Sequence, residues 1–299
     1  MTAPGGPRRG VDGARAAERR ATPAPTFDTV IVSYQSEREI GDLLDDLRRI
    51  APAHRIVVVD NASTDASARI VRERHPEVTL LANRENVGYA RAANQGIAAG
   101  DADFVFLLNP DIRLPDPAFH EVMLAGIRTD ARVAAVGPLQ YQLWRGREHL
   151  NHTWSYWSPR ALAYFVARSF GLAKGARAPL PTAFLNAGCL LLRRSAFDEV
   201  GGFDERYFLY GEEPDLFFKL RRYGYRALLL RATRVVHLRE RSIRRLPPGQ
   251  RWRRRLGAAR NITLAVARGV AGLARSRPRR DGSAADGGSP ARDRPPTAD

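Results

Sequence analysis

The stretch FVFLLNPDI, residues Phe104–Ile112, holds the feature that decides the fold. Its five consecutive apolar residues predict a β-strand buried on both faces, as in a parallel sheet covered by helices. The strand runs directly into Asn109, Pro110 and Asp111. All three are common turn formers, so a simple turn is one explanation for them. The alternative is that the turn holds a ligand, with the proline fixing the backbone and thereby the direction of the Asp111 carboxylate.

Strand and helix patterns alternate on both sides of this stretch. Continuous apolar runs predict strands at 29–34, 55–60, 78–82, 104–108 and 133–138. Apolar stripes and Ala-rich segments predict helices at 37–50, 63–75, 88–100 and 116–129. This alternation is typical of an α/β fold with a mostly parallel, Rossmann-like sheet and helices on both faces.

The pattern changes after residue 139. Residues 140–181 follow no clear period, and a segment of that length is typical of a functional loop or lid. Beyond it, residues 182–194 predict a pair of strands, and an apolar stripe in 216–223 predicts a helix. The runs RALLL (226–230) and RVVH (234–237) predict two further strands.

The net charge of +16 is concentrated at the two ends of the chain. The balance is +3 over residues 1–26, +11 over residues 238–299 and only +2 over the body between them. A nearly neutral body with basic ends argues against a nucleic-acid-binding core and fits attraction to an anionic surface. Their composition predicts disorder at 1–26 and 281–299. We therefore expect a folded α/β domain at 27–245 and a basic extension at 246–280.

The composition also bears on the compartment. Cys189 is the single cysteine, which fits a reducing environment, and its apolar neighbours indicate a small core residue and not a nucleophile. The sequence has no apolar run of about 18 residues, so no membrane-spanning helix is expected. The N-terminal arginines precede no apolar segment of the secretory type. We expect a cytoplasmic protein, peripheral at the inner face of the plasma membrane.

Polar side chains follow each of the first four strands. They are Ser33, Tyr34 and Gln35, then Asp60, Asn61 and Asp65, then Asn83, Arg84 and Asn86, and finally Asn109 and Asp111. Ligands of open α/β sheets bind at the carboxyl ends of the strands, so one site on this edge is expected. Carboxylates and amides suit a nucleobase, a ribose or a divalent cation. Neither a P-loop nor a dinucleotide-binding fingerprint occurs, which argues against a P-loop NTPase and a nicotinamide dehydrogenase.

Seven motifs run in order across roughly residues 28–245. They are VIVSYQS, IVVVDNASTD, NRENVGYARAANQGI, LLNPDI, NAGCLLLRR, VGGFDERYFLYGEEPDLFFKLRRYGY, and VVH with Ser242 five residues on. In this order they resemble the family 2 glycosyltransferases, above all their rhamnosyltransferase-like branch. The resemblance implies a GT-A fold and an enzyme of the hexosyltransferase class that transfers a sugar with inversion at the anomeric carbon. It implies a nucleotide diphosphate sugar donor, dTDP- or UDP-linked with rhamnose favoured, and a saccharide or lipid-linked saccharide acceptor.

The resemblance also implies roles for single residues on the donor side. Those near the nucleotide and sugar would be Ser33, Asp60, Asp65, Asn86, Gly88, Arg91 and Asn94, with Asp60 on the nucleobase. Asn109-Pro110-Asp111 matches the family's metal-binding Asp-x-Asp. Asp111 would therefore ligate Mg²⁺ or Mn²⁺, Asn109 replaces the first Asp, and His237 falls where the family has a histidine near the metal and diphosphate.

The segment YGEEPDL falls where the family has Glu-Asp-x-Asp-Leu, whose second acid is the general base. That position is Glu213 here, a departure that leaves Glu212 and Asp215 as alternatives. A positioned base that takes the proton of an acceptor hydroxyl typically contributes ~10²–10⁴-fold to the rate. The three acids equally suit a helix N-terminus, where negative charge is favoured by the helix dipole.

The basic extension has helical periodicity. Its apolar stripe consists of Trp252, Leu256, Ala259, Thr263, Val266, Val270 and Leu273, and arginines occupy the other faces. This pattern predicts either a basic amphipathic helix on an anionic membrane surface or a helix packed on the body. Two other functions remain open from the sequence: a nucleotidyltransferase of similar α/β shape, and a non-catalytic adaptor that binds a membrane surface or nucleic acid through the tails.

Overall fold

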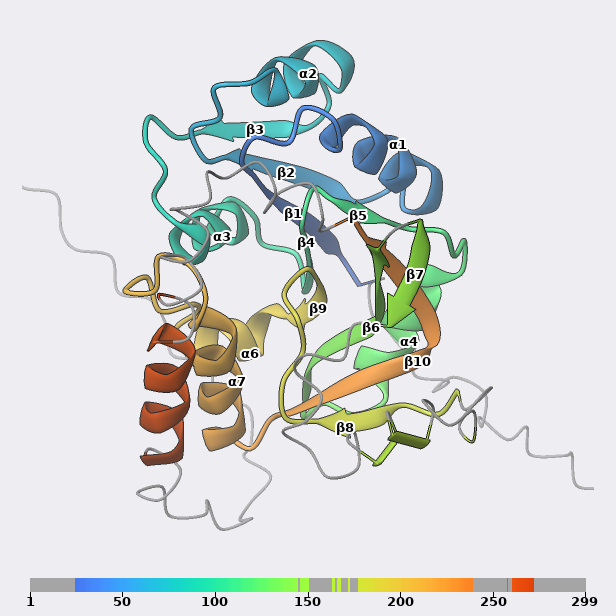
Figure 1. Ribbon diagram of the computed structural model, residues 1–299, viewed down its shortest axis with the longest axis vertical. Coiled ribbons are helices and arrows are strands. Elements are labelled where there is room, and N and C mark those ends of the chain that lie inside the picture. The colour runs from blue at the N-terminus through green and yellow to red at the C-terminus, as the bar shows by residue number, and fades with distance from the viewer. Residues whose placement is uncertain are drawn as a thin grey trace, which may run out of the picture.

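The computed structural model describes residues 25–144, 146–150, 163–164, 166–167, 172, 177–238, 257 and 260–271 (Figure 1). The predicted disordered tails therefore lie almost wholly outside the described residues. So do most of the irregular segment 140–181 beyond residue 150 and the first part of the basic extension, including Trp252 and Leu256.

The core of the molecule is one mixed sheet with the strand order β3-β2-β1-β4-β9-β6-β10-β5, to which β7 adds beside β6 and β8 beside β10. The strands are β1 (Phe27–Ser33), β2 (Arg55–Asp60), β3 (Thr79–Ala82), β4 (Phe104–Leu108), β5 (Ile112–Arg113), β6 (Val133–Trp144), β7 (Arg147–Leu150), β8 (Leu180–Thr182), β9 (Cys189–Arg193) and β10 (Arg226–His237). The first four strands in the order are parallel, as are β6 and β10, and β9 joins the two groups antiparallel to both neighbours.

Helices cover both faces of the sheet (Figure 1). They are α1 (Ile40–Ile50), α2 (Ser67–Arg74), α3 (Tyr89–Ala98), α4 (Phe119–Arg128), α6 (Arg194–Glu199), α7 (Glu212–Arg222) and a C-terminal helix at 260–271, drawn in red. Helices α1, α2 and α4 share one apolar cluster with the sheet, and α3, α6 and α7 share the other. None of the helices among these residues combines the length and apolar character needed to cross a bilayer.

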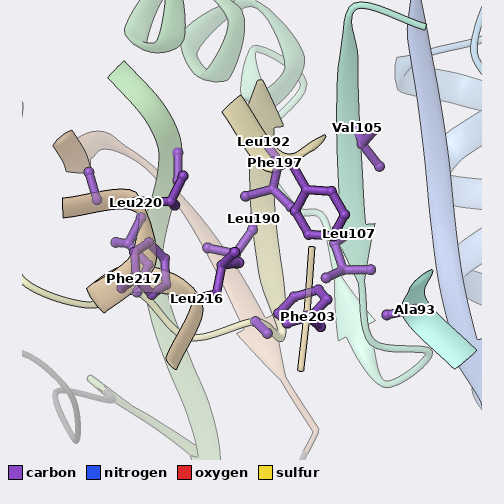
Figure 2. Packing of buried hydrophobic residues seen from close by; sticks show 14 of the residues in the cluster. Ala93, Val105, Leu107, Leu190, Leu192, Phe197, Phe203, Leu216, Phe217 and Leu220 are labelled. Atoms are coloured by element: carbon purple, nitrogen blue, oxygen red, sulfur yellow. The ribbon is translucent and has the colours of Figure 1, made fainter. Parts of the chain in front are cut away.

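The continuous apolar runs of β1, β2 and β4 are strands buried on both faces, as predicted, whereas β3 at the edge of the sheet is exposed or half-buried along its length. In β1, Val30 belongs to one cluster and Ile31 to the other, and both are fully buried. The cluster beneath α7 bridges the two halves of the sheet, because Leu107 of β4 and Leu190 of β9 lie in it together with Phe217 of α7 (Figure 2). Burial of each such side chain stabilises the fold by about 1.5–3 kcal/mol.

Two strand predictions were wrong in detail. Residues 182–194 do not form a pair of strands with each other, because β8 pairs with β10 while β9 inserts between β4 and β6. RALLL and RVVH are a single strand, β10, interrupted by a register shift between Leu230 and Arg234. Apolar runs indicate which residues are extended and buried, but the pairing partner is set by contacts distant in sequence.

The C-terminal helix packs on the body, which was one of its two predicted placements. Ala265 is fully buried, and a Cβ added to Gly269 would lie 2.1 Å from ring atoms of Phe218 in α7. Thr263 and Val270, two members of the predicted apolar stripe, are exposed. The predicted stripe was therefore wrong at these positions, because the contact uses small residues that allow a close approach to α7.

A pair of histidines lies at the end of the sheet opposite to the predicted site. The Nε2 atoms of His54 and His120 are 2.9 Å apart, and His54 Nδ1 is 3.1 Å from the Thr29 hydroxyl. The ring of Phe27 stacks on His54 with centroids 4.9 Å apart. Burial, and then the neighbouring His120, lower the pKa of His54 to about 4.

We expect acid to destabilise the protein through His54. The unfolded chain takes up a proton at His54 near its ordinary pKa of about 6.5, whereas the folded chain does so only near 4. The free energy of unfolding should therefore fall, by on the order of 2–3 kcal/mol, as the pH drops from 6.5 to 4. Urea denaturation at several pH values measures this. His54→Phe keeps a ring against Phe27 but binds no proton, so its slope should be smaller; an equal slope in both proteins would contradict the expectation.

Candidate functional site

The carboxyl ends of β1, β2 and β4 border a pocket of about 260 Å³. The residues singled out from the sequence that line it are Asn86, Gly88, Asn109, Asp111, Glu212, Glu213 and His237. Ser33, Asp60, Asp65, Arg91, Asn94 and Asp215 are not among its lining residues. Tyr34 and Asn61, two of the polar residues expected at this edge of the sheet, also line the pocket. So do four residues for which the sequence predicts no role: Tyr89, Asn186, Phe208 and Tyr210.

The turn after β4 brings Asp111 against His237. After Asp111 the chain forms β5, which pairs antiparallel with the end of β10 and places Ile112 opposite His237. The Nε2 atom of His237 lies 3.0 Å from Oδ1 of Asp111, and both side chains are buried. The backbone N–H of Leu238 also donates to the Asp111 carbonyl at 2.9 Å. Two residues 126 positions apart in the sequence thus form one fixed pair at the pocket wall.

This pair is chemically suited to a divalent cation. A carboxylate oxygen and an imidazole nitrogen are both metal ligands, and within the described residues His237 Nδ1 has no hydrogen-bond partner. The described part of the chain contains no cluster of three or more His, Cys, Asp or Glu side chains with metal-site geometry. The arrangement therefore fits a cation such as Mg²⁺, which takes one or two protein ligands and completes its shell with phosphate and water.

Two adjacent carboxyl groups face the same pocket from the start of α7. Oε1 of Glu213 accepts a hydrogen bond from the Ala187 N–H at 2.6 Å. Glu212 is 3% exposed, and no hydrogen-bond partner in the described residues reaches its Oε2 atom. Burial, and then the charge of Glu213, raise the pKa of Glu212 to about 8. Burial thus favours the neutral form of Glu212. Asp215 lies 3.2 Å from Lys219 Nζ and does not line the pocket.

Ser33 and Asp60, the last residues of β1 and β2, are buried and do not line the pocket. Ser33 is paired with Asp60 in the parallel register, and in the described structure neither Ser33 Oγ nor Asp60 Oδ1 has a hydrogen-bond partner. Asp65 has a different environment, because its carboxylate accepts N–H bonds from Ser67 at 3.0 Å and Glu37 at 3.1 Å. Asp65 thereby ties the start of α2 to the loop after β1.

An amide network fixes the entry into α3. Nδ2 of Asn61 donates to Asn86 Oδ1 at 3.0 Å and to the Gly88 carbonyl at 3.2 Å. Oδ1 of Asn61 accepts from the Val87 N–H at 3.0 Å and from Asn83 Nδ2 at 3.2 Å. The sequence signal for this network is the presence of asparagines directly after two successive strands: Asn61 after β2, and Asn83 and Asn86 after β3.

Arg91 and Asn94 contact a loop and not the pocket. Arg91 Nε lies 2.8 Å from Glu205 Oε2, and Asn94 exchanges hydrogen bonds with the backbone of Phe203 at 3.0 and 3.1 Å. The two side chains therefore attach α3 to the segment 203–211 that leads into α7.

That segment approaches α3 at Gly88, which has a φ of 85°. The N–H of Tyr89 donates to the Phe208 carbonyl at 2.9 Å. The ring of Phe208 is 54% exposed at the pocket. Two residues further on, Tyr210 has a φ of 64°, a conformation that costs about 1–3 kcal/mol in a residue with a Cβ and clusters at functional sites.

The sequence of the segment that contains most of the sheet strands identifies the family of the chain. Residues 28–201 match the model described as Glycosyl transferase family 2. The chain belongs to this family. It is 34% identical over 219 residues to the N-acetylglucosaminyl-diphospho-decaprenol L-rhamnosyltransferase of Mycobacterium tuberculosis, covering 64% of this chain and 69% of the relative. It is also 26% identical over 201 residues to the low-salt glycan biosynthesis hexosyltransferase Agl10 of Haloferax volcanii, covering 64% and 61%.

Solved structures agree on the fold. The mannosyltransferase PcManGT from Pyrobaculum calidifontis, in complex with GDP-Man and Mn²⁺, superposes with a TM-score of 0.56 at 22% identity, covering 84% of this chain and 74% of that one. Staphylococcus aureus TarS 1–349 has a TM-score of 0.54 at 18% identity, covering 71% and 60%. These structures confirm the predicted GT-A fold, and membership of the family together with the 34% identical relative confirms the prediction of a glycosyltransferase.

The contact at Gly88 gives a test of the site's packing. A Cβ at Gly88 would lie 2.5 Å from the Phe208 carbonyl oxygen and 2.9 Å from Phe208 Cα, whereas at Gly201, with a similar φ of 77°, nothing lies within 4 Å. Gly88→Ala should therefore cost more than Gly201→Ala, which carries only the backbone penalty of about 1–2 kcal/mol. Thermal unfolding of both variants measures the difference. Equal losses would show that the segment at Phe208 moves away without cost.

Proposed function

We propose that this glycosyltransferase moves a sugar, with inversion, from a nucleotide diphosphate sugar to a hydroxyl of a saccharide or lipid-linked saccharide. The observation that carries the proposal is the meeting of two pairs, Asp111 with His237 and Glu212 with Glu213, around one pocket. The similarity to an L-rhamnosyltransferase favours rhamnose as the sugar and a dTDP- or UDP-linked donor.

The donor is assigned to the edge formed by β1, β2 and α3. Ser33 Oγ and Asp60 Oδ1 are buried polar atoms that a nucleobase edge would satisfy, in keeping with the cost of leaving such atoms unpaired. Asn86, Gly88 and Asn109 face the pocket beside the sugar and diphosphate positions. The donor-site roles assigned to Asp65, Arg91 and Asn94 become indirect: these residues hold the loops around the donor.

Asp111 and His237 are the residues that would hold Mg²⁺ or Mn²⁺. When bound, such a cation neutralises the diphosphate and stabilises the charge that develops on the leaving group. Two structural neighbours contain Mn²⁺ with a nucleotide or nucleotide sugar, which supports a divalent cation here. Pro110 and the β5–β10 pairing hold the Asp111 carboxylate in place before the donor arrives.

Glu213 is assigned as the base. It takes the proton of the acceptor hydroxyl while the hydroxyl oxygen bonds to the anomeric carbon from the face opposite the diphosphate. The bond from that carbon to the diphosphate oxygen breaks, and its electron pair stays on the diphosphate. Glu212 remains protonated beside the base, so that the acidic pair carries a single negative charge in a site where two would repel.

The basic extension is assigned to an anionic membrane surface, where a lipid-linked acceptor would reside, and not to nucleic acid. Residues 246–280 contain ten arginines and neither Asp nor Glu. In the described part of this extension, Arg260, Leu264 and Val270 are exposed. Exposed arginines and apolar side chains together suit the interface of an anionic leaflet, which supports our assignment of the enzyme to the cytoplasmic face of the plasma membrane.

Donor binding is the direct test of the metal site. With Mn²⁺ or Mg²⁺ present, dTDP-rhamnose or its UDP counterpart should raise the midpoint of thermal unfolding, because a ligand at about 100 times its Kd stabilises the native state by about 2.7 kcal/mol. Asp111→Asn should lose the metal-dependent part of the shift. Asp101→Asn, at an exposed position, is the matched control and should keep it. A full metal-dependent shift in Asp111→Asn would overturn the role given to this residue.

The acidic pair makes an asymmetric prediction for the rate. Glu213→Gln removes the base and should lower kcat by about 10² or more. Glu212→Gln replaces a neutral acid by a neutral amide of the same size and should retain most of the activity near pH 7. Above pH 8 ionisation of Glu212 should slow the wild type, and Glu212→Gln should lack this decline. The reverse ranking of the two variants would make Glu212 the base.

A further inference from the structure

The C-terminal helix lies alongside α7, next to the loop that carries the acidic pair (Figure 1). The family match ends at residue 201, so this helix, α7 and the segment 203–211 all lie beyond it. The helix nevertheless contacts the pocket loop directly. Nδ2 of Asn261 donates to the Leu209 carbonyl at 3.2 Å. Leu209 itself lines the pocket.

Asn261 contacts the loop on both sides of Tyr210. Its side chain reaches Leu209, and its backbone oxygen would lie 3.1 Å from a Cβ added to Gly211, which has a φ of 104°. Tyr210, between them, holds a positive φ of 64°. A strained residue of this kind persists only when its surroundings determine its conformation, and Asn261 supplies contacts at both of its neighbours.

Further contacts seat the helix against the same elements. Gly269 lies against the Phe218 ring of α7, and Ala265 is fully buried. Arg268 Nη1 is 3.5 Å from the Tyr207 hydroxyl at the other end of the loop. The helix therefore holds the loop in the middle and at one end, while Arg91 and Asn94 of α3 hold the segment before it.

We propose that the C-terminal helix is a positioning element of the active site, in which Asn261 holds the loop 207–211 so that Glu212 and Glu213 face the pocket. Helix α7 begins at Glu212, two residues after the strained Tyr210, so relaxation at Tyr210 displaces both carboxyl groups. The exposed Phe208 ring and Tyr210, which share the loop, would move with them and give the acceptor saccharide its apolar contact surface.

This inference rests on the proposed function, because it assigns the loop to the acceptor and the base. No hydrogen bond within the described residues joins Asn261 to Ser33 or Asp60, which end β1 and β2 on the donor edge. Loss of the Asn261 contact should therefore change turnover and the acceptor KM while leaving donor binding unchanged. If the helix only stabilised the fold, loss of the Asn261 contact would not change turnover and the acceptor KM without also changing donor binding.

The test compares Asn261→Ala and Asn261→Asp in the full chain with Ala267→Ser, an exposed substitution on the same helix. Asn261→Asp keeps the shape of the side chain but has no N–H to donate, so it should match Asn261→Ala. Both should lower kcat/KM for the acceptor about tenfold or more, with an unchanged donor-induced thermal shift. Ala267→Ser should behave as the wild type. Wild-type kinetics in both Asn261 variants would overturn the inference.

Tyr210→Gly identifies the mechanism, since glycine adopts a positive φ without strain. In the Tyr210→Gly background, Asn261→Ala should cost much less than in the wild type, and strictly additive losses would contradict the proposed link. Amide hydrogen exchange over 207–213 separates this inference from the proposed function. Exchange should rise in Asn261→Ala whatever sugar the enzyme transfers, and unchanged exchange would overturn the role of Asn261 even in an active enzyme.

Discussion

The antiparallel contact between β5 and the end of β10 is the constraint on which the site depends. A single pairing, Ile112 opposite His237, turns the end of a buried strand back toward the sheet and places Asp111 3.0 Å from His237. Both side chains are buried, and burial of a carboxylate costs free energy unless an oppositely charged group or a hydrogen-bond donor is its partner. The short β5 strand therefore holds Asp111 and His237 together at the pocket wall, where we propose that a cation and a diphosphate bind.

The two carboxyl groups at the start of α7, Glu212 and Glu213, differ in their hydrogen bonding and therefore in their charge. Glu213 accepts a backbone N–H bond, whereas the Glu212 oxygen Oε2 has no such partner in the described residues. Burial then favours the neutral form of Glu212, and the pair settles with one proton. The loop before α7 also restricts the positions of these acids, since Tyr210 and Gly211 directly before them both have positive φ angles.

Local pattern in the sequence was sufficient for the elements and for the approximate location of the site. The apolar runs at β1, β2 and β4 and the polar residues at their ends follow from local chemistry, and Asp111, Glu213 and His237 did converge on one pocket. Local pattern did not indicate which strands are neighbours in the sheet or which loop each helix contacts. The insertion of β9 between β4 and β6, and the contacts of Arg91 and Asn94 with the 203–205 segment, join residues about 55 to 115 positions apart. The buried face of the C-terminal helix was also not predicted. Ala265 and Gly269 have little apolar surface to reveal a buried stripe, and they pack well because their small size allows the helix to approach α7 closely.

The place of β9 in the sheet has a consequence for the order in which the protein is made. Strands β1 to β4 come first in the chain and form one contiguous parallel block of the sheet, so their pairing requires no later segment. The outer edge of β4 is different, because its neighbour β9 follows about 80 residues later, after β6 and β7 have already emerged. During that interval an apolar strand edge has no partner in the nascent chain, and such edges are prone to pair with other chains. The interval between β4 and β9 is thus the stage of biogenesis at which this enzyme most needs protection by a chaperone.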